Sequence, residues 1–547
     1  MPKRKATRSR MADAWHGSFL YGMLIGGRAP SRLARLAPPP LPGSIARGEA
    51  IVGGRLVCAG RALKPERPDW TAPDLSRAAV IELNSFEWLD DLAALGNELA
   101  QARARALVED WILAHRGWRP VAWDAEPTGK RIASWLAHAP FLSRGEGDAL
   151  GPLLLESVAR QARHLARVAM DEPTGLGRLS ALRGLVYAQA CGVVNGSGLP
   201  GLAEAMARAA GMDLLTDGFH ASRSPSAQLR ALTYLVDARA AIEGASARTP
   251  DALHRAIEKL APAVRFFRHG DGAFALFNDS NEEEAAAIDA VLARAQWPDL
   301  PTARAVAAGF DRITADRLTL IVDSGLPVDG NYAAQAHAGT LSFEMSCGRE
   351  RLIVNCGAGP RDDSEWSLAL RATAAHSTLC AEDADSSPVA PGGLLSRPSH
   401  VDANREEADG NVWLDLAHDG YVGRLGFVHR RRIFVAGDGQ DLRGEDSLVP
   451  VDGKPPVLTT TRFDIRFHLH PDVQVSVIQN GAAALLRLPS GQAWRLQTAG
   501  ARVDLGESVY FGKRGSARRG EQVVVTAVAG ASGATVKWAF KRIAGGK

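Results

Sequence analysis

The sequence lacks the features that mark several large classes of protein. No apolar run approaches the ~18 residues that a membrane-spanning helix needs. The five cysteines, at positions 58, 191, 347, 356 and 380, are odd in number and fit no disulfide framework or paired metal motif. Lys and Arg number 64 against 61 Asp and Glu, so nothing demands a nucleic-acid partner. We therefore expect a soluble globular protein with reduced thiols and no transmembrane segment.

A clear export signal is also missing. Residues 15–25 follow a small basic tail, residues 3–10, and resemble the start of a signal peptide. The apolar part is short, contains His16 and has no small-x-small cleavage site. We interpret residues 15–25 as an interfacial or folded segment, and the compartment stays open.

The length of 547 residues is too great for one hydrophobic core and predicts two or three domains. Residues 28–75 are rich in Pro, Gly and Arg, with a short hairpin expected over 51–58. We place an N-terminal extension that wraps the core at residues 1–78, a helical domain at 79–310 and a strand-rich domain at 316–547.

Helical periodicity begins near residue 80. Trp88, Leu92, Leu95 and Leu99 are spaced by three and four residues, as on one face of a helix. Hydroxyl–proline pairs at Ser224 and Thr249 are typical helix starts. Further helices are predicted at 148–170, 178–194, 200–210, 225–242, 250–267 and 281–296. These helices predict an all-α domain, and periodicity alone does not separate a toroid from a bundle.

The periodicity changes to two near residue 316. Short strands are predicted at 317–322, 412–416, 432–435 and 523–528, and glycines bound many of them. Many short strands without intervening helices indicate an antiparallel sandwich. The predicted fold class is thus multidomain, helices first and β-sandwich second.

A polar turn at residues 217–225 leads into one of the predicted helices. Asp217, His220 and Arg223 lie within seven residues. Arg223 has the planar fork that pairs with a carboxylate, and His220 can transfer a proton near neutral pH. The alternative is that Asp217 and Arg223 only bond the loop backbone.

A second polar group ends the helix predicted at 250–267. Arg268 and its neighbours suit the negative end of a helix dipole, and Gly270 suits the C′ position. His269 and Asp271 are not explained in this way. A basic rim for an anionic glycan is the second interpretation.

Histidines also stand at strand ends. His337 begins a strand, His376 precedes one, and Asn355 and Cys356 follow a third. Imidazole and thiolate bind zinc, although this spacing is no zinc signature. The alternative is a hydrogen-bonded pair of histidines at a domain interface.

Taken together, the sequence resembles the heparinase II/III-like proteins, a polysaccharide lyase family, over nearly its whole length. The matching pieces are residues 86–92, 131–136, 217–225, 265–272 and 337–378. The resemblance implies an incomplete (α/α) toroid followed by an antiparallel β-sandwich. It also implies β-elimination of an acidic, uronic-acid polysaccharide and a place in the cell envelope or periplasm.

The chain departs from the lyase pattern at several positions. Gln335 stands where the first, often catalytic, histidine of a His-x-His-x-Asp motif is usual, and His337 stands at the second. Asn355 replaces an acid. Residues 226–228 read Ser-Ala-Gln where the family often has x-Tyr-His, and no Asn-His pair precedes them.

Elimination requires a neutralised carboxylate, a base for the C5 proton and an acid for the leaving oxygen. Through the resemblance we assign neutralisation to Arg223 with help from Arg268, the base to His220 or His337, and the acid to Tyr332. An ordinary loop tyrosine is the alternative for Tyr332. Substrate binding is assigned to Asp217, Arg268, His269 and Asp271.

Three other functions stay open: a glycoside hydrolase on the same scaffold, a catalytically reduced glycan-binding protein, and a structural envelope protein. We expect the polar groups to line one cleft between the domains. Any zinc would be held by His337 and His376, and we expect it to be weak or absent because Asn355 removes a charged ligand.

Overall fold

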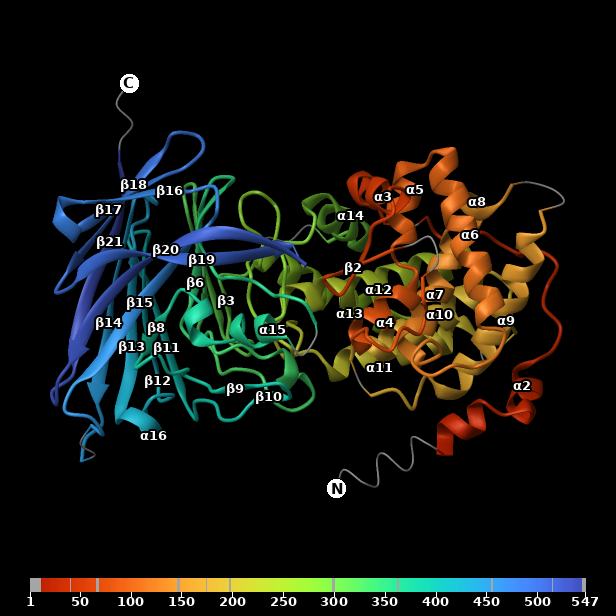
Figure 1. Ribbon diagram of the computed structural model, residues 1–547, viewed down its shortest axis with the longest axis horizontal. Coiled ribbons are helices and arrows are strands. Elements are labelled where there is room, and N and C mark those ends of the chain that lie inside the picture. Colours follow the sequence, from red (N-terminus) through yellow and green to blue (C-terminus); the bar gives the residue numbers. More distant parts are fainter. Residues whose placement is uncertain are drawn as a thin grey trace. The chain divides into compact units, whose positions relative to one another are not determined.

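A computed structural model describes residues 11–543, apart from residues 40, 65–67, 145–147, 174, 196–197, 298–300, 362–363, 454–455 and 514. The basic tail at residues 3–10 lies outside the described part. The chain divides into two compact units: one is residues 1–213, 229–261 and 289–297, and the other is 214–228, 262–288 and 298–547. Figure 1 shows mostly helices in the red to light-green part of the chain and mostly strands in the part that follows, up to blue. The domain limits expected from the sequence stay predictions.

Helices build the first unit, and the six later helices expected from the sequence are confirmed to within a few residues. The helices are α2 (Phe19–Ile25), α3 (Ile45–Val52), α4 (Arg77–Ser85), α5 (Leu89–Leu95), α6 (Glu98–Ala114), α7 (Ala125–Ala137), α8 (Ala139–Leu142), α9 (Leu150–Val168), α10 (Leu176–Ala190), α11 (Leu199–Met212), α12 (Pro225–Gly244), α13 (Asp251–Phe266) and α14 (Ala285–Ala295). The last three cross the division between the units.

An aromatic cluster forms the centre of this unit. Phe86, Trp111 and Trp135 pack edge to face, with ring centroids 5.1–6.2 Å apart. The Arg131 guanidinium lies 4.0 Å from the Trp111 ring and is fully buried. Helices α7 and α10 approach closely at Gly129, where a Cβ would meet the Ser180 carbonyl at 2.2 Å. The motif at residues 131–136 is therefore core rather than site.

Two local predictions are wrong. A hairpin was expected over 51–58, but residues 51 and 52 are the end of helix α3, whose first turn is capped by the Ser44 hydroxyl. The hairpin lies later in the chain, where strand β1 (Leu56–Cys58) pairs with β2 (Arg61–Leu63). The apolar stripe from Trp88 to Leu99, expected on one helix, is divided between two helices. Gly96, at φ 64°, ends α5, and Asn97 caps α6.

The second unit contains two large antiparallel sheets. The strands are β3 (Arg304–Ala305), β4 (Phe310–Ala315), β5 (Leu318–Asp323), β6 (Phe343–Cys347), β7 (Glu350–Val354), β8 (Leu379–Ala381), β9 (Val389–Ala390), β10 (Gly393–Leu394), β11 (Val401–Ala408), β12 (Asn411–His418), β13 (Phe427–Val435), β14 (Asp441–Pro450), β15 (Thr461–Leu469), β16 (Gln474–Ile478), β17 (Ala483–Arg487), β18 (Ala493–Ala499), β19 (Arg502–Lys513), β20 (Ser516–Ala529) and β21 (Ala534–Ile543). Short helices α15 (Glu365–Ala369) and α16 (Val422–Leu425) and the 3₁₀ turns η1 (Gly330–Gln335), η2 (Thr373–Ala375) and η3 (Gln479–Gly481) connect them.

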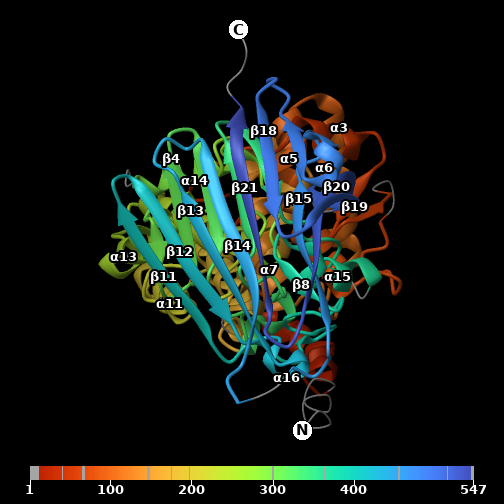
Figure 2. The same cartoon turned by 90° about the vertical axis from the view of Figure 1, so that its left-hand side faces the viewer.

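The strand order shows how the sheets are assembled. One sheet runs β11-β12-β13-β14-β21-β18-β17-β16, and the other runs β19-β20-β15-β7-β6-β5-β4-β3, with β8 beside β15. Strand β21 thus lies between β14 and β18, in the middle of the eight-stranded sheet (Figure 2). The strands predicted at 317–322, 412–416, 432–435 and 523–528 are confirmed in type.

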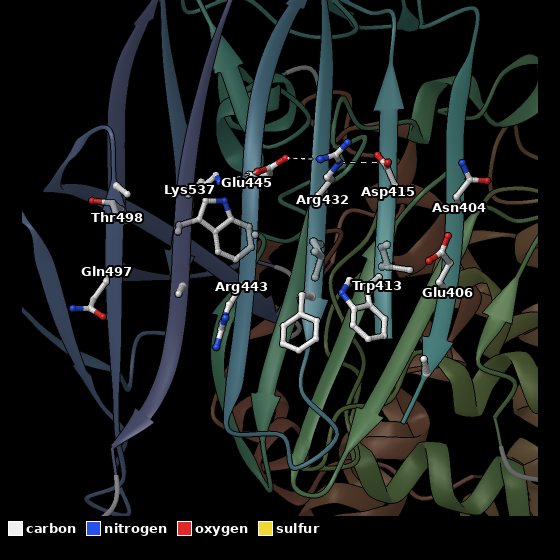
Figure 3. Close-up of a pocket in the computed structure, with 18 of the residues that line it drawn as sticks. Asn404, Glu406, Trp413, Asp415, Arg432, Arg443, Glu445, Gln497, Thr498 and Lys537 are labelled. Carbon is white, nitrogen blue, oxygen red and sulfur yellow. Dashed lines mark hydrogen bonds and ion pairs between the residues drawn. The ribbon is translucent and has the colours of Figure 1, made fainter. Parts of the chain in front are cut away.

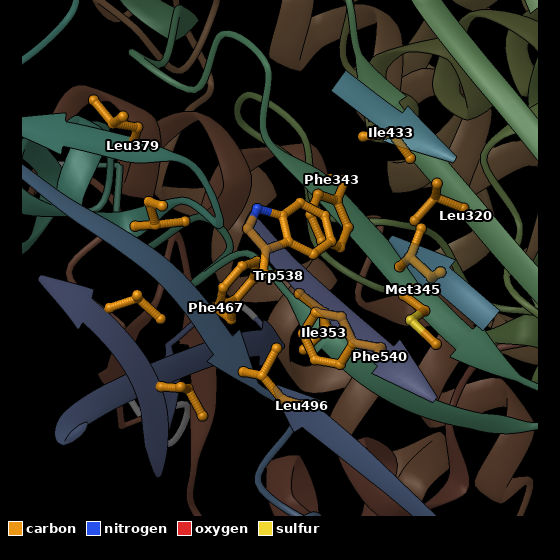
Figure 4. Close-up of a cluster of buried hydrophobic side chains, with 14 of the residues drawn as sticks. Leu320, Phe343, Met345, Ile353, Leu379, Ile433, Phe467, Leu496, Trp538 and Phe540 are labelled. Atoms are coloured by element: carbon orange, nitrogen blue, oxygen red, sulfur yellow. The ribbon is translucent and has the colours of Figure 1, made fainter. Parts of the chain in front are cut away.

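Side chains from both sheets form one core, as Figure 4 shows. Phe343 and Phe467 come from the nine-stranded sheet, and Trp538 and Phe540 from β21 of the eight-stranded sheet. The Trp538 ring stacks on Phe343 at 5.8 Å and meets Phe467 edge to face at 5.2 Å. Alternation along β12 and β13 places one side chain in the core and the next outside it.

A charged network is buried within this apolar core. The Asp446 carboxylate accepts hydrogen bonds from Arg431 Nε at 2.7 Å, His429 Nε2 at 2.7 Å and Trp538 Nε1 at 2.8 Å. Arg431 also donates to the carbonyls of Leu341 and Ser377. The charge of Arg431 overcomes the effect of burial and holds the pKa of Asp446 below its usual range.

Candidate functional site

The turn ahead of α12 holds Arg223 in a strained conformation. Arg223 has a φ of 53°, in the left-handed region that costs a non-glycine residue about 1–3 kcal/mol. The Asn278 side chain donates to the Arg223 carbonyl at 2.8 Å, and the Arg223 N–H donates to the His220 carbonyl at 2.8 Å. The backbone is therefore fixed from both sides.

Arg223 is 5 % exposed, and its guanidinium is fully engaged in hydrogen bonds. Its guanidinium forms an ion pair with Asp323 at 2.6 Å and a longer second contact to the same carboxylate at 3.5 Å. The three remaining N–H groups donate to the carbonyls of residues 308, 309 and 326. Since a guanidinium has five N–H groups, every donor of Arg223 already has an acceptor inside the protein. This geometry agrees with the alternative interpretation of the sequence, in which Arg223 bonds backbone groups of the protein rather than a substrate.

His220 is buried in the same turn with its tautomer fixed. Its Nδ1 accepts from the Ser222 N–H at 3.2 Å and lies 2.8 Å from the Ser222 hydroxyl. The proton of the neutral ring is therefore on Nε2, which has no hydrogen-bond partner among the described residues. Burial lowers the pKa of His220 to about 4. As placed, His220 can donate a hydrogen bond but has no free lone pair to act as a base.

The structure brings the four predicted catalytic residues, His220, Arg223, Tyr332 and His337, together in the second unit. The rings of His220 and Tyr332 meet edge to face at 5.1 Å. Asn278 joins the turn to the sandwich: it contacts Arg223 through its amide nitrogen and accepts from the His337 N–H at 3.4 Å through its oxygen. Gln335 lies in η1 between Tyr332 and His337.

His337 and His376 form a hydrogen-bonded pair. His337 Nδ1 lies 3.1 Å from His376 Nε2, and His376 Nδ1 lies 2.8 Å from the Ala372 carbonyl. A carbonyl only accepts, so His376 carries its proton on Nδ1 and receives a hydrogen bond from His337 Nδ1. Burial lowers the pKa of His376 to about 4. The neutral His337 ring then carries its proton on Nδ1 and its lone pair on Nε2, the tautomer opposite to that of His220.

The donors near this pair do not fit a zinc site. Asn355 accepts from the Ser377 N–H and donates to the Leu276 carbonyl, and Cys356 Sγ lies 3.5 Å from His468. Over the described ranges, no cluster of three or more His, Cys, Asp or Glu side chains could hold a metal. Zinc sites in proteins use three or four protein ligands, and this one offers two.

The group at residues 265–272 is tied to the strands by a glutamate that the sequence analysis missed. Glu344 in β6 is fully buried, lies 3.1 Å from His269 Nε2 and accepts the N–H groups of Leu276 and Asn355. Burial lowers the pKa of His269. The available signal was a charged residue placed directly between Phe343 and Met345 in a predicted strand.

The remaining predicted binding residues also have partners within the protein. Asp271 pairs with the buried Arg351 at 2.8 Å; burial favours the neutral acid, but the charge of Arg351 prevails and lowers the pKa of Asp271. Asp217 accepts the N–H groups of Ala307 and Ala308, and Arg268 Nε donates to the Gly272 carbonyl. These contacts brace loops, and a substrate would compete with them.

A hollow of about 1160 Å³ lies elsewhere, on the outer face of the eight-stranded sheet (Figure 3). Strand register aligns Trp413, Phe434 and Arg443 as cross-strand neighbours. The two rings are 5.2 Å apart, and the guanidinium lies 5.7 Å from the Phe434 ring. Next to them, Arg432 pairs with both Asp415 and Glu445. Sequence reasoning missed this surface because its residues come from separate strands.

Comparison with known proteins identifies the class. Residues 298–539 match the family described as heparinase II/III-like, C-terminal. FtsZ-localized protein C of Caulobacter vibrioides is 32 % identical to this chain, over 99 % of the chain and 96 % of the relative. The chain belongs to the heparinase II/III-like family.

Solved structures of lyases share the fold. A crystal structure of heparinase III has a TM-score of 0.70 at 12 % identity and covers 92 % of this chain and 85 % of its own. Heparan sulfate lyase HepC from Pedobacter heparinus has a TM-score of 0.58 at 13 % identity and covers 92 % and 83 %. The expected fold, an α/α toroid followed by an antiparallel β-sandwich, is confirmed.

Proposed function

We propose that this chain has kept the lyase scaffold, has lost efficient lyase chemistry, and acts by binding partners at the site of cell division. The observation that carries the first part is Arg223. Every donor of its guanidinium is engaged within the protein, so a substrate carboxylate would have to displace Asp323 or a carbonyl. The division role is supported by the 32 % identical relative, whose name places it with FtsZ.

The proton-transfer positions support the same proposal. Gln335 replaces the usual catalytic histidine and does not titrate. His220 has its lone pair occupied by Ser222, and its pKa of about 4 makes it a weak base. Among the four predicted catalytic residues, His337 has the tautomer of a base, with its lone pair on Nε2. A base acting alone deprotonates a uronate poorly while the carboxylate is still charged.

The first prediction concerns turnover. Purified protein incubated with a panel of uronic-acid polysaccharides is expected to give no increase in ultraviolet absorbance from unsaturated sugars and no new reducing ends. A polysaccharide lyase run in parallel shows that each substrate can be cleaved. Steady release of unsaturated product by the wild-type chain would reject the loss of chemistry.

A residual lyase is the second candidate function, and the His337 geometry favours it. In that case the activity should fall ~10²–10⁴-fold in His337→Ala, as for removal of a general base. His220→Ala should change it less, since His220 is placed as a donor. A larger loss of activity in His337→Ala than in His220→Ala would show that the activity belongs to this chain, because neither substitution changes a contaminating enzyme.

The second prediction concerns FtsZ. A fluorescent fusion of the chain is expected to colocalise with FtsZ in dividing cells, and the purified chain to bind purified FtsZ. The surface to test first is the hollow of Figure 3, because exposed Trp and Arg side chains often dominate interfaces. Trp413→Ala should weaken binding roughly tenfold or more. Trp366→Ala, which removes a half-exposed tryptophan on α15, is the matched control.

Equal binding by Trp413→Ala and wild type would assign the contact to another surface. Wild-type protein that neither binds FtsZ nor colocalises with it would reject the division role and leave the loss of lyase chemistry untouched.

A further inference from the structure

Exposed apolar side chains gather near the N-terminus of the described chain. Between residues 11 and 24, six large apolar side chains are exposed: Met11, Trp15, Phe19, Leu20, Met23 and Leu24. Phe19 is 82 % exposed, more than any other large apolar residue of the described chain. Single exposed apolar residues are ordinary, but a contiguous group of them marks an interaction site.

The segment is held firmly on the first unit by its other face. Tyr21 and Ile25 are buried, and the Tyr21 hydroxyl donates to His164 Nδ1 of α9 at 2.7 Å. His164 Nε2 lies 2.8 Å from the Trp123 carbonyl, which fixes the tautomer that lets Nδ1 accept. Arg163 donates to the Ile25 carbonyl at 3.3 Å. Four of the exposed side chains, Phe19, Leu20, Met23 and Leu24, are therefore presented on a helix that is fixed to the first unit.

Helix α2 is apolar on all sides. Its sequence, Phe19–Ile25, contains no charged residue, whereas a helix at the surface of a globular protein normally has a polar outer face. Packing on α9 covers only the side of Tyr21 and Ile25. The described part of the chain contains no helix that is both long and apolar enough to cross a membrane. The uncovered face therefore suits an apolar layer that it enters only partly.

The charge around the segment is strongly basic. Residues 1–48 contain nine Lys and Arg and one acidic residue, Asp13, although the whole chain has a net charge of only +3. Arg28, Arg32 and Arg35 follow α2 directly and are exposed. The remainder of the chain is thus net acidic. An apolar helix face with Trp and Phe, set among cations, is the composition that binds anionic lipid surfaces.

We propose that residues 11–25 dock this protein on an anionic lipid bilayer. The side chains of Phe19, Leu20 and Met23 enter the boundary between headgroups and acyl chains, and the arginines that follow pair with lipid phosphates. A protein partner fits less well, because interfaces between proteins are depleted of lysine and this segment is preceded by two. The proposal is independent of FtsZ association and of any lyase activity.

Flotation of the full chain with lipid vesicles tests the proposal. Binding is expected to vesicles of phosphatidylcholine and phosphatidylglycerol in equal parts, and to be at least ~10-fold weaker to phosphatidylcholine alone. Salt should weaken it, because the Debye length falls from ~10 Å at 0.1 M to ~3 Å at 1 M. Arg28→Glu with Arg32→Glu should reduce the anionic preference without unfolding the chain, since both side chains are exposed.

The deciding variant is Phe19→Ser with Met23→Ser. Both side chains face solvent, so the melting temperature should not change, while vesicle binding should fall at least ~10-fold. Leu99→Ser with Met212→Ser removes two similarly exposed apolar side chains elsewhere in the first unit and should bind as wild type.

Three outcomes overturn the proposal. The first is that the wild-type chain does not float with anionic vesicles, and the second is that the Phe19/Met23 variant floats as well as wild type. The third is that light scattering shows a dimer of the wild-type chain and a monomer of the same variant, which would make a second copy the occupant of this face.

Discussion

Asp446→Ala is expected to destabilise the second unit by about 3–5 kcal/mol, the range for removing one partner of a buried ion pair. Asp446 is fully buried and accepts from Arg431, His429 and Trp538. Its loss leaves the Arg431 charge without a counter-ion in an apolar core. Urea unfolding followed by far-ultraviolet circular dichroism should show a lower midpoint.

A matched control lies on the same sheet. Asp415 pairs with Arg430 and Arg432, but its side chain is 37 % exposed. Solvent screens this pair, so Asp415→Ala should cost between zero and about 1 kcal/mol. Similar midpoints for the two variants would show that the buried network does not stabilise the fold.

Acid is expected to unfold both units well above the pH at which carboxylates titrate. Burial lowers the pKa of His115, His164, His220 and His376 to about 4 and that of His468 to about 3. In the unfolded chain each would titrate near 6.5. Between these values the unfolded state binds protons that the folded state does not. The stability from these residues is therefore complete above pH ~6.5 and is lost as the pH falls toward 4.

The expected loss is large compared with the stability of a typical protein. A difference of one pKa unit corresponds to about 1.4 kcal/mol, and a whole domain is stable by only about 5–15 kcal/mol. The melting temperature should thus fall steeply between pH ~6.5 and ~5, while it changes little between pH ~7 and ~8.

A single substitution tests the assignment to histidine. In His220→Asn, the side-chain oxygen can accept from the Ser222 N–H in place of Nδ1 without titrating. This variant should lose part of the pH dependence between 6.5 and 4. A wild-type melting temperature that stays level down to pH 5 would show that these rings are protonated in the folded state.

Periodicity in the sequence was enough to predict the elements that pack by one regular face. Helix α9 and strand β5 appear close to their predicted limits because their apolar spacing alone determines them. Gly96 and Asn97 interrupt a stripe that looks continuous from Trp88 to Leu99. At these two residues, helix caps end one helix and begin the next. The apolar spacing alone therefore predicted one helix where there are two.

For the polar site, the sequence predicted which residues come together but not which partners they have there. The turn with His220 and Arg223 and the histidines 337 and 376 do meet, through Asn278 and Tyr332. What the residues do there depends on partners far along the chain, and Asp323 lies 100 residues from Arg223. Such pairing leaves no local pattern, so a loop-bracing arginine and a substrate-binding arginine look the same in the sequence.

The central place of β21 has a consequence for how the protein is made. Until residues 534–543 have been synthesised, the eight-stranded sheet exists only as two separate parts, β11–β14 and β16–β18. The inner edges of β14 and β18 then expose unpaired N–H and C=O groups that can recruit a strand from another nascent chain. Chains interrupted before residue 534 should consequently be prone to aggregation and dependent on chaperones, although most of the sandwich has already been translated.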